Sequence, residues 1–354
     1  MCFQTTAVSS CLFNKAQQDE VVSQQVRNKF LRNNISMSVT IIMPVKNSGK
    51  YIRETLESIA DQQGVDYQLL AYDNGSTDGT LEILNDWIPR RIPGRVISDC
   101  PTSYPASLAK LVLRSNTEYI ARLDSDDVMA NNRLIRQVEF LNANPEVGLL
   151  GTGMLTMDSD SKITGIYGWD PVPTDHSSIL LSMLAFQPPI AHPSVMMRRD
   201  VVLKAGNYRD IHAVEDLDLW LRISKVSTIA VLNENLTVYR QHSDSVTAGV
   251  VADRTLETRG HAVIADNALA FGLEPAKMSS ILSREAYLGV RDVMSIWKAT
   301  RLPVFASKHQ LYSLFIALKG FLGPRDYLLR TLVVFICWNG CNRFILQKIK
   351  NALF

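Results

Sequence analysis

The sequence predicts an α/β protein built on a mainly parallel sheet with helices on both faces. From Val39 onward, short apolar segments of strand length alternate with segments whose apolar residues recur at helical spacing, a pattern typical of such sheets. Polar clusters at 44–47, 73–76 and 124–127 close three of the apolar segments. Because ligands bind outside the carboxyl ends of strands in these sheets, the clusters indicate a binding edge.

The expected elements follow in chain order. Residues 39–45 form the first predicted strand, and apolar residues at helical spacing predict a helix over 51–59. A second strand at 69–72 ends in a turn, after which Thr77 or Asp78 can cap the next helix. The further expected elements are a strand at 96–97, a helix over 108–113, a strand at 119–123, a helix over 133–141 and a strand at 147–152.

The composition is that of an ordinary globular protein. Of the 354 residues, 46% are hydrophobic and 20% are charged, which argues against a disordered or repetitive chain. The net charge of +2 is divided unevenly, because residues 297–354 carry +8 and the remainder carries −6. An acidic body lacks the basic surface that general nucleic-acid binding needs, so no nucleic-acid partner is expected.

Three parts are expected along the chain. Residues 1–36 are a polar, Gln-rich extension, which is either foreign to a natural protein starting at Met37 or a short helix on the surface. Residues 37–248 form the α/β domain, and residues 249–354 form a helical, basic region. The five cysteines are odd in number without zinc-finger spacing, and the start lacks the apolar core of a signal peptide, so a reduced, cytoplasmic chain is expected.

Three carboxylates stand within four residues at Asp124, Asp126 and Asp127. A divalent cation would relieve their mutual repulsion, and their hard oxygen ligands suit Mg²⁺ or Mn²⁺. The alternative is an acidic loop that caps the following helix. The position directly after a buried strand of an α/β pattern favours the metal site.

Two further clusters are ambiguous when each is taken alone. Residues 73–80 form a turn with a helix cap, and Asp73 at the strand end could also accept hydrogen bonds from a nucleotide base. Glu215 and Asp216 open an apolar helix, where the helix dipole favours ionised acids. A carboxylate at the mouth of a pocket can serve as a general base, but these two can equally be a capping pair.

Together these segments resemble family-two inverting glycosyltransferases. The matching segments are 39–47 (VTIIMPVKN) and 73–80 (DNGSTDGT) for the opening, 121–127 (ARLDSDD) for the metal motif, 191–199 and 215–222 for the acceptor side, and 239–242 (YRQH) for the end of the domain. They occur in the family's order between Val39 and Val246, and the combination is specific. Asn74 departs from the family, which often has a second Asp there, so Asp73 is the safer carboxylate for the base.

The resemblance implies a fold of the GT-A type, a single α/β unit with a nucleotide half and an acceptor half. It implies that Pro44, Val45 and Asn47 line the nucleotide pocket and that Asp73 contacts the uracil. Asp124 is expected near the ribose and the metal.

The resemblance also assigns residues to the metal and to the chemistry. Asp126 is the direct ligand of Mn²⁺ or Mg²⁺, and His242 either completes the metal or diphosphate site or is a surface histidine. Asp216 is the expected general base, and Glu215 a neighbour that orients it or the acceptor. His192 is expected to organise the acceptor side rather than ligate metal.

The implied reaction moves a sugar from a UDP-hexose or UDP-N-acetylhexosamine to a hydroxyl of a glycan acceptor, with inversion. The resemblance suggests a lipid-linked acceptor in bacterial O-antigen, capsule or exopolysaccharide synthesis. Leu311–Leu322 and Tyr327–Trp338 are each short of the ~20 apolar residues that span a bilayer. With the basic excess, they indicate a region that lies peripherally on the cytoplasmic face of the membrane, the alternative being helices packed on the catalytic domain.

Three rival functions are weaker. A nucleotidyltransferase on a similar fold would carry a glycine-rich signature with a following basic residue, which is not evident. A non-catalytic module that binds sugar nucleotides does not need the intact acids at 124, 126 and 216. A processive polysaccharide synthase would need spanning helices and a Gln-x-x-Arg-Trp motif, which the sequence lacks.

Overall fold

The computed structural model describes residues 38–168, 173–184, 188–243 and 255–271, and the structural findings concern these residues. The expected extension at 1–36 lies outside them, as do the two apolar stretches of the basic region and every cysteine except Cys100, which is an exposed free thiol. Among the helices of the described part, none is both long and apolar enough to cross a membrane.

One mixed sheet runs through the protein in the order β3-β2-β1-β4-β8-β6-β9-β5, with β7 added beside β6. The parallel half consists of β3 (Gly94–Ile97), β2 (Asp66–Asp73), β1 (Ser38–Val45) and β4 (Tyr119–Arg122). Every residue of β1 after Ser38 is buried, as expected for a strand covered on both faces. The predicted α/β fold class is therefore confirmed.

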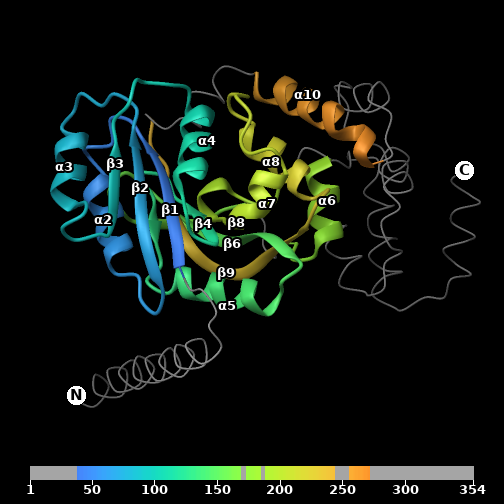
Figure 1. The fold of residues 1–354 in the computed structure, drawn as a ribbon, viewed down its shortest axis with the longest axis horizontal. Helices are drawn as coiled ribbons and strands as arrows, with labels where there is room; N and C mark the ends of the chain where they lie inside the picture. Colours follow the sequence, from blue (N-terminus) through green and yellow to red (C-terminus); the bar gives the residue numbers. More distant parts are fainter. Residues whose placement is uncertain (1–37, 169–172, 185–187, 244–254, 272–354) are drawn as a thin grey trace, which may run out of the picture.

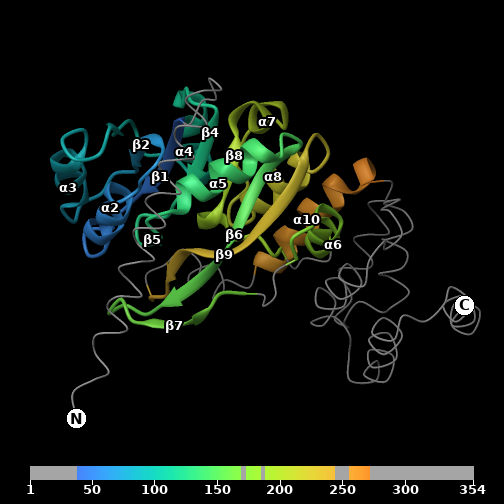
Figure 2. The same ribbon diagram turned by 90° about the horizontal axis from the view of Figure 1, so that it is seen from below.

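The other half of the sheet mixes directions. Its strands are β8 (Met196–Arg198), β6 (Val147–Met157), β9 (Thr228–Arg240), β5 (Val128–Met129) and β7 (Ile163–Ile166). β6 and β9 pair in parallel, and Figure 2 shows them running side by side away from β4. β8, β5 and β7 pair antiparallel with their neighbours, and the sequence pattern did not predict them.

Helices cover both faces of the sheet. One face carries α2 (Ile52–Ala60), α3 (Thr80–Trp87) and α5 (Arg133–Ala143). The other face carries α4 (Tyr104–Arg114), α6 (His176–Leu184), α7 (Arg199–Lys204), α8 (Glu215–Ile223) and α10 (Leu256–Ala268). In Figure 1, α2 and α3 lie on one side of β1 and β2, and α4 lies on the other. Each face of the sheet has its own hydrophobic core. Because strand side chains alternate, Ile41 and Met43 pack into the core beneath α2, α3 and α5, and Ile42 packs into the core on the opposite face.

Several observed elements begin or end a few residues away from the predicted positions, and α4, α3 and β6 are the informative cases. α4 starts at Tyr104 rather than Leu108, because Ser103 accepts the N–H of Ala106 and a proline occupies the first turn. The N-cap of α3 is Gly79 at φ 88°, not Thr77 or Asp78. β6 continues to Met157, because β9 pairs with it along its whole length.

The helix α10 belongs to the core although it falls in the predicted C-terminal region. Its residues Val263, Ile264 and Ala268 join the hydrophobic cluster that contains Trp220 of α8. The Nζ of Lys225 also donates a hydrogen bond of 2.8 Å to Asn267 Oδ1. The described start of the 249–354 region thus packs on the α/β fold, while the boundary at 248 stays a prediction.

Candidate active site

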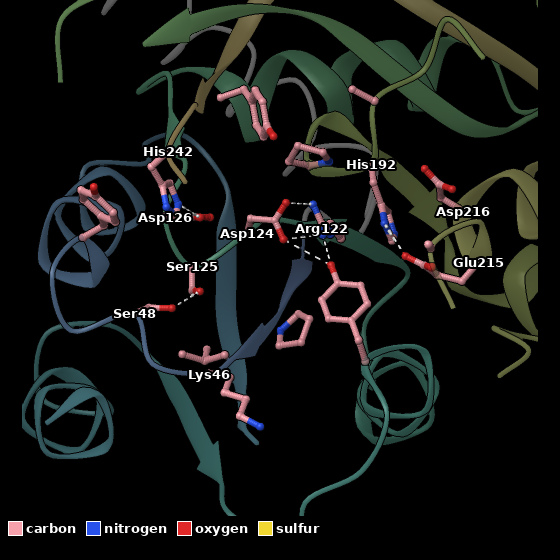
Figure 3. A pocket seen from close by; sticks show the side chains of 18 of the residues that line it. Lys46, Ser48, Arg122, Asp124, Ser125, Asp126, His192, Glu215, Asp216 and His242 are labelled. Atoms are coloured by element: carbon pink, nitrogen blue, oxygen red, sulfur yellow. Dashed lines mark hydrogen bonds and ion pairs between the residues drawn. The ribbon is translucent and has the colours of Figure 1, made fainter. Parts of the chain in front are cut away.

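A cleft of about 410 Å³ opens at the carboxyl ends of β1, β2 and β4, where sheets of this kind bind ligands. Its size is that of an ordinary ligand pocket. The predicted site residues that line it are Pro44, Val45, Asn47, Asp124, Asp126, Glu215, Asp216 and His242. Figure 3 shows Arg122 and Asp124 between Asp126 and His242 on one side and Glu215 and Asp216 on the other.

Hydrogen bonds between backbone N–H groups and side-chain oxygens hold the loop after β1 against the turn after β2. Asn47 adopts φ 51°, an uncommon conformation that Asn tolerates. Its Oδ1 accepts the N–H of Thr77 at 2.8 Å, and its own N–H donates to Ser76 Oγ at 2.9 Å. The N–H of Gly49 donates to Asp78 at 2.8 Å, and a Cβ at Gly49 would come within 2.9 Å of the Asp78 carbonyl. These contacts fix the wall expected to hold the nucleotide.

Asp73 lies behind this wall rather than on it. Its carboxylate is buried and accepts the N–H groups of Gly75 and Ser76 at 3.2 to 3.3 Å. The neighbouring Asn74 lines the cleft, with its side chain bonded at both ends to the backbone of Thr102. Because Asp73 does not line the cleft, the structure does not show a contact between Asp73 and a uracil base, and that contact stays a prediction.

Asp124 is held by a buried arginine that sequence reasoning missed. Nη1 of Arg122 donates to Asp124 Oδ2 at 2.5 Å, and Nη2 donates to the other carboxylate oxygen and to the Tyr104 hydroxyl. Burial raises the pKa of Asp124, and the adjacent guanidinium acts against that rise. A charged residue within a predicted buried strand was the available signal, because such a residue needs a partner.

Asp126 contacts His242 because of the short strand β5. This strand follows the acidic loop directly and pairs Val128 with Val238 of β9, so the end of β9 returns to the loop. His242 Nε2 then lies 2.8 Å from Asp126 Oδ2. Arg240 supports the loop, since its Nε donates to the Asp126 carbonyl at 2.9 Å.

Asp127 is fully buried behind the other two acids. Its Oδ1 accepts the backbone N–H of Arg240 at 2.9 Å, and within the described part of the chain its Oδ2 has no hydrogen-bond partner. Burial, with the charges of Asp124 and Asp126, raises its pKa well above the usual value. The alternative that it caps a helix is wrong, because α5 begins only at Arg133.

The three acids could hold a divalent cation. One oxygen from each of Asp124, Asp126 and Asp127 lies within 4.8 Å of the others. The oxygen-only donor set is the one that Mg²⁺ and Mn²⁺ prefer, and the unpartnered Asp127 Oδ2 is the kind of buried atom that a cation satisfies. The acidic loop thus fits the predicted metal.

Glu215 and Asp216 form the first turn of α8. The Glu215 side chain is only 8% exposed, and its Oε1 lies 3.6 Å from Nδ1 of His192. Burial, followed by the charge of Asp216, raises the pKa of Glu215 to about 8. Burial also raises the pKa of Asp216, whose Oδ1 accepts the N–H of Leu217 at 2.7 Å. Burial here outweighs the helix dipole that favours ionised acids.

His192 sits in an aromatic cluster next to Glu215. Its Nε2 lies 2.9 Å from the Tyr208 hydroxyl, and its ring packs edge-on against Trp220 and Tyr104. Burial and the nearby Arg122 lower its pKa well below the usual value, so the imidazole is neutral. These contacts lie on the side of the cleft expected to bind the acceptor.

A second buried arginine, Arg133, ties the elements of the site together. It donates to the carbonyls of Pro193, Arg122 and Val195 at 2.7 to 3.1 Å and to Gln137 Oε1 at 3.0 Å. These bonds link α5 to the end of β4 and to the turn that carries His192. No sequence pattern indicated this role, because an arginine at a helix start is usually exposed.

The family and the relatives that this chain resembles are all described as glycosyltransferases. The family described as "Glycosyl transferase family 2" matches residues 40–205. The putative glycosyltransferase EpsE of Bacillus subtilis is 30% identical over 60% of this chain and 76% of its own length. The O-antigen biosynthesis glycosyltransferase WbnJ of Escherichia coli is 28% identical over 60% of this chain and 84% of its own length.

Solved structures share the fold at lower identity. The S. aureus protein TarS, residues 1–349 in complex with UDP-GlcNAc, superposes with a TM-score of 0.56 at 18% identity, covering 86% of this chain and 88% of that one. The mannosyltransferase PcManGT of Pyrobaculum calidifontis, in complex with GDP-Man and Mn²⁺, gives 0.50 at 16% identity over 94% and 96%. Both likenesses support the GT-A type of fold.

Proposed function

Because the chain belongs to glycosyltransferase family 2, we propose that it transfers one sugar from a nucleotide-sugar to a hydroxyl group with inversion at the anomeric carbon. One observation carries this proposal: Asp124 and Asp126 of the acidic loop line the same cleft as the acidic pair Glu215 and Asp216. The first supplies ligands for a cation next to a diphosphate, and the second supplies a base.

The proposed donor is a UDP-hexose or UDP-N-acetylhexosamine. A neighbour of the same fold is known in complex with UDP-GlcNAc, and another in complex with GDP-Man and Mn²⁺. In this chain Pro44, Val45 and Asn47 would line the nucleotide part of the cleft, and Asp124 would lie near the ribose. Asp73, which is buried behind this wall in the structure, would contact the base only if a bound nucleotide reached behind the wall. Asp126, with Asp124 and His242 beside it, would hold Mn²⁺ or Mg²⁺.

The proposed reaction is a single displacement. A bound cation would stabilise the negative charge that develops on the diphosphate leaving group. Asp216 takes the proton of the acceptor hydroxyl while that oxygen forms a bond to the anomeric carbon. The bond from that carbon to the diphosphate oxygen breaks on the opposite face, so the configuration inverts. Glu215 orients the acceptor beside the base.

The proposed acceptor is a lipid-linked glycan in the synthesis of a bacterial surface polysaccharide. The relatives' names support this class, since WbnJ acts in O-antigen biosynthesis and AmsE of Erwinia amylovora in amylovoran biosynthesis. We propose that the basic region of 249–354 holds the enzyme peripherally on the cytoplasmic face of the membrane. Co-sedimentation of the full chain should then need anionic lipid in the vesicles, and equal binding to neutral vesicles would argue against it.

A panel of nucleotide-sugars tests the proposed function. The full chain is incubated with each donor and Mn²⁺, and release of the nucleotide is measured. We expect turnover of one UDP-sugar that stops on addition of a chelator. A chain that binds UDP but turns over no donor in the panel would be a non-catalytic module, and turnover that a chelator leaves unchanged would overturn the metal dependence.

A further inference from the structure

Glu215 presents a buried polar atom to the cleft. Its side chain is 8% exposed and lines the cleft, and in the described structure its Oε2 has no hydrogen-bond partner. Leaving such a buried atom without a hydrogen bond destabilises a folded protein. A ligand that bonds to Oε2 would remove this destabilisation, so the atom indicates a binding contact.

Among the described residues, the groups around Glu215 do not offer it a free cation. They are His192, Tyr104, Tyr208, Arg122, Asp124 and Asp216. The guanidinium of Arg122 is engaged by both carboxylate oxygens of Asp124. His192 lies at 3.6 Å, too far for a hydrogen bond, and burial keeps its imidazole neutral. Asp216 and Asp124 add negative charge, which disfavours a second anion.

Resting on the function proposed above, we propose that Glu215 binds the sugar acceptor as an uncharged carboxyl group, with Oε2 donating a hydrogen bond to an acceptor oxygen. Asp216 is the next residue of the same helix turn and borders the same cleft. An uncharged Glu215 therefore leaves Asp216 to carry the negative charge of the pair. The two carboxyl groups then have different roles. Glu215 donates a hydrogen bond to the acceptor, and Asp216 accepts the proton of the attacking hydroxyl.

An uncharged Glu215 that binds the acceptor makes transfer depend on pH in a way that a purely structural residue would not. Burial and the charge of Asp216 raise the pKa of Glu215 to about 8. If the uncharged form binds the acceptor, kcat/KM for the acceptor should fall above about pH 8, the value of that pKa. Glutamine keeps the shape and donates a hydrogen bond through its amide, but it does not ionise.

The experiment compares Glu215→Gln, Glu215→Ala and Asp216→Asn across pH, with calorimetric UDP binding as the check that each variant folds. Glu215→Gln should keep transfer within about tenfold of the parent and lose the decline above pH 8. Glu215→Ala should raise the acceptor KM by about tenfold and leave the donor KM within about twofold. Asp216→Asn should lose transfer.

Three results would overturn the assignment. In the first, Glu215→Gln loses as much activity as Asp216→Asn, which would mean that the ionised form of Glu215 is needed. In the second, the alkaline decline persists in Glu215→Gln. In the third, Glu215→Ala raises the donor KM instead of the acceptor KM. Absence of transfer by the parent chain would instead contradict the proposed function, so the two failures are distinguishable.

Discussion

The imidazole Nε2 of His242 lies 2.8 Å from the carboxylate Oδ2 of Asp126, although 116 positions separate the two residues in the chain. The contact depends on β5 and β9, which bring the end of the domain to the acidic loop. His242 thereby fixes the orientation of the carboxylate expected to bind the cation most directly.

His242→Ala should weaken the binding of Mn²⁺ by about 10- to 100-fold, because a carboxylate ligand loses the group that orients it. Titration of Mn²⁺ into the protein without nucleotide measures this affinity. His212→Ala is the matched control, since His212 is exposed and lies outside the cleft. If His242→Ala bound Mn²⁺ as tightly as His212→Ala does, His242 would have no role in the proposed metal site.

Asp126→Ala should abolish the dependence of UDP binding on Mn²⁺. The reason is that the acidic loop would hold a cation next to a bound diphosphate only while its principal ligand, Asp126, is present. Calorimetric titrations of UDP with and without Mn²⁺ measure the effect. Asp160→Ala removes an exposed acid outside the cleft and should behave like the parent chain. UDP binding by Asp126→Ala that still increases with Mn²⁺ would argue against this ligand.

Arg133→Met should lower the free energy of unfolding by about 3 kcal/mol, because it leaves buried carbonyls without donors. Arg133 is fully buried and bonds to the carbonyls of Pro193, Arg122 and Val195. Arg136→Met on the same helix is the control, and it should cost less than about 1 kcal/mol, since that side chain is half exposed. Denaturant unfolding of both variants measures the difference, and equal losses would contradict the role of Arg133.

Glu215→Gln should stabilise the protein increasingly as the pH rises. Burial raises the pKa of Glu215 from 4.5 to about 8, so the folded state keeps this proton to a higher pH than the unfolded state does. The associated stability is complete below the unfolded pKa and is lost as the pH rises towards the folded one. At pH 7 the variant should gain on the order of 3 kcal/mol, with little gain near the unfolded pKa. A gain that does not change with pH would contradict the raised pKa.

Local patterns account for what the sequence predicted. β1 is apolar from Ile41 to Val45 and β2 from Leu69 to Tyr72, and α8 has an apolar face behind two acids, so each could be recognised within ten residues. The start of α4 was also readable from a serine cap followed by proline, but the prediction began the helix at Leu108.

The missed features depend on contacts between distant segments. β5 has two residues and β8 has three, too few for any periodicity to register. The hydrogen bonds from Arg122 to Asp124 and Tyr104 require α4 to lie close to the end of β4, and no local sequence pattern encodes that proximity. The burial that raises the pKa of Glu215 is likewise a property of the packed cleft.

Asp216 is the proposed base of the reaction, and the transfer rate of Asp216→Asn measures its contribution. The variant is compared with the parent chain, using the donor that the panel identifies, and UDP affinity is measured in parallel. We expect a loss of transfer of about 10²-fold or more with UDP affinity unchanged, because asparagine cannot accept the proton of the acceptor hydroxyl. Normal turnover by Asp216→Asn would contradict it.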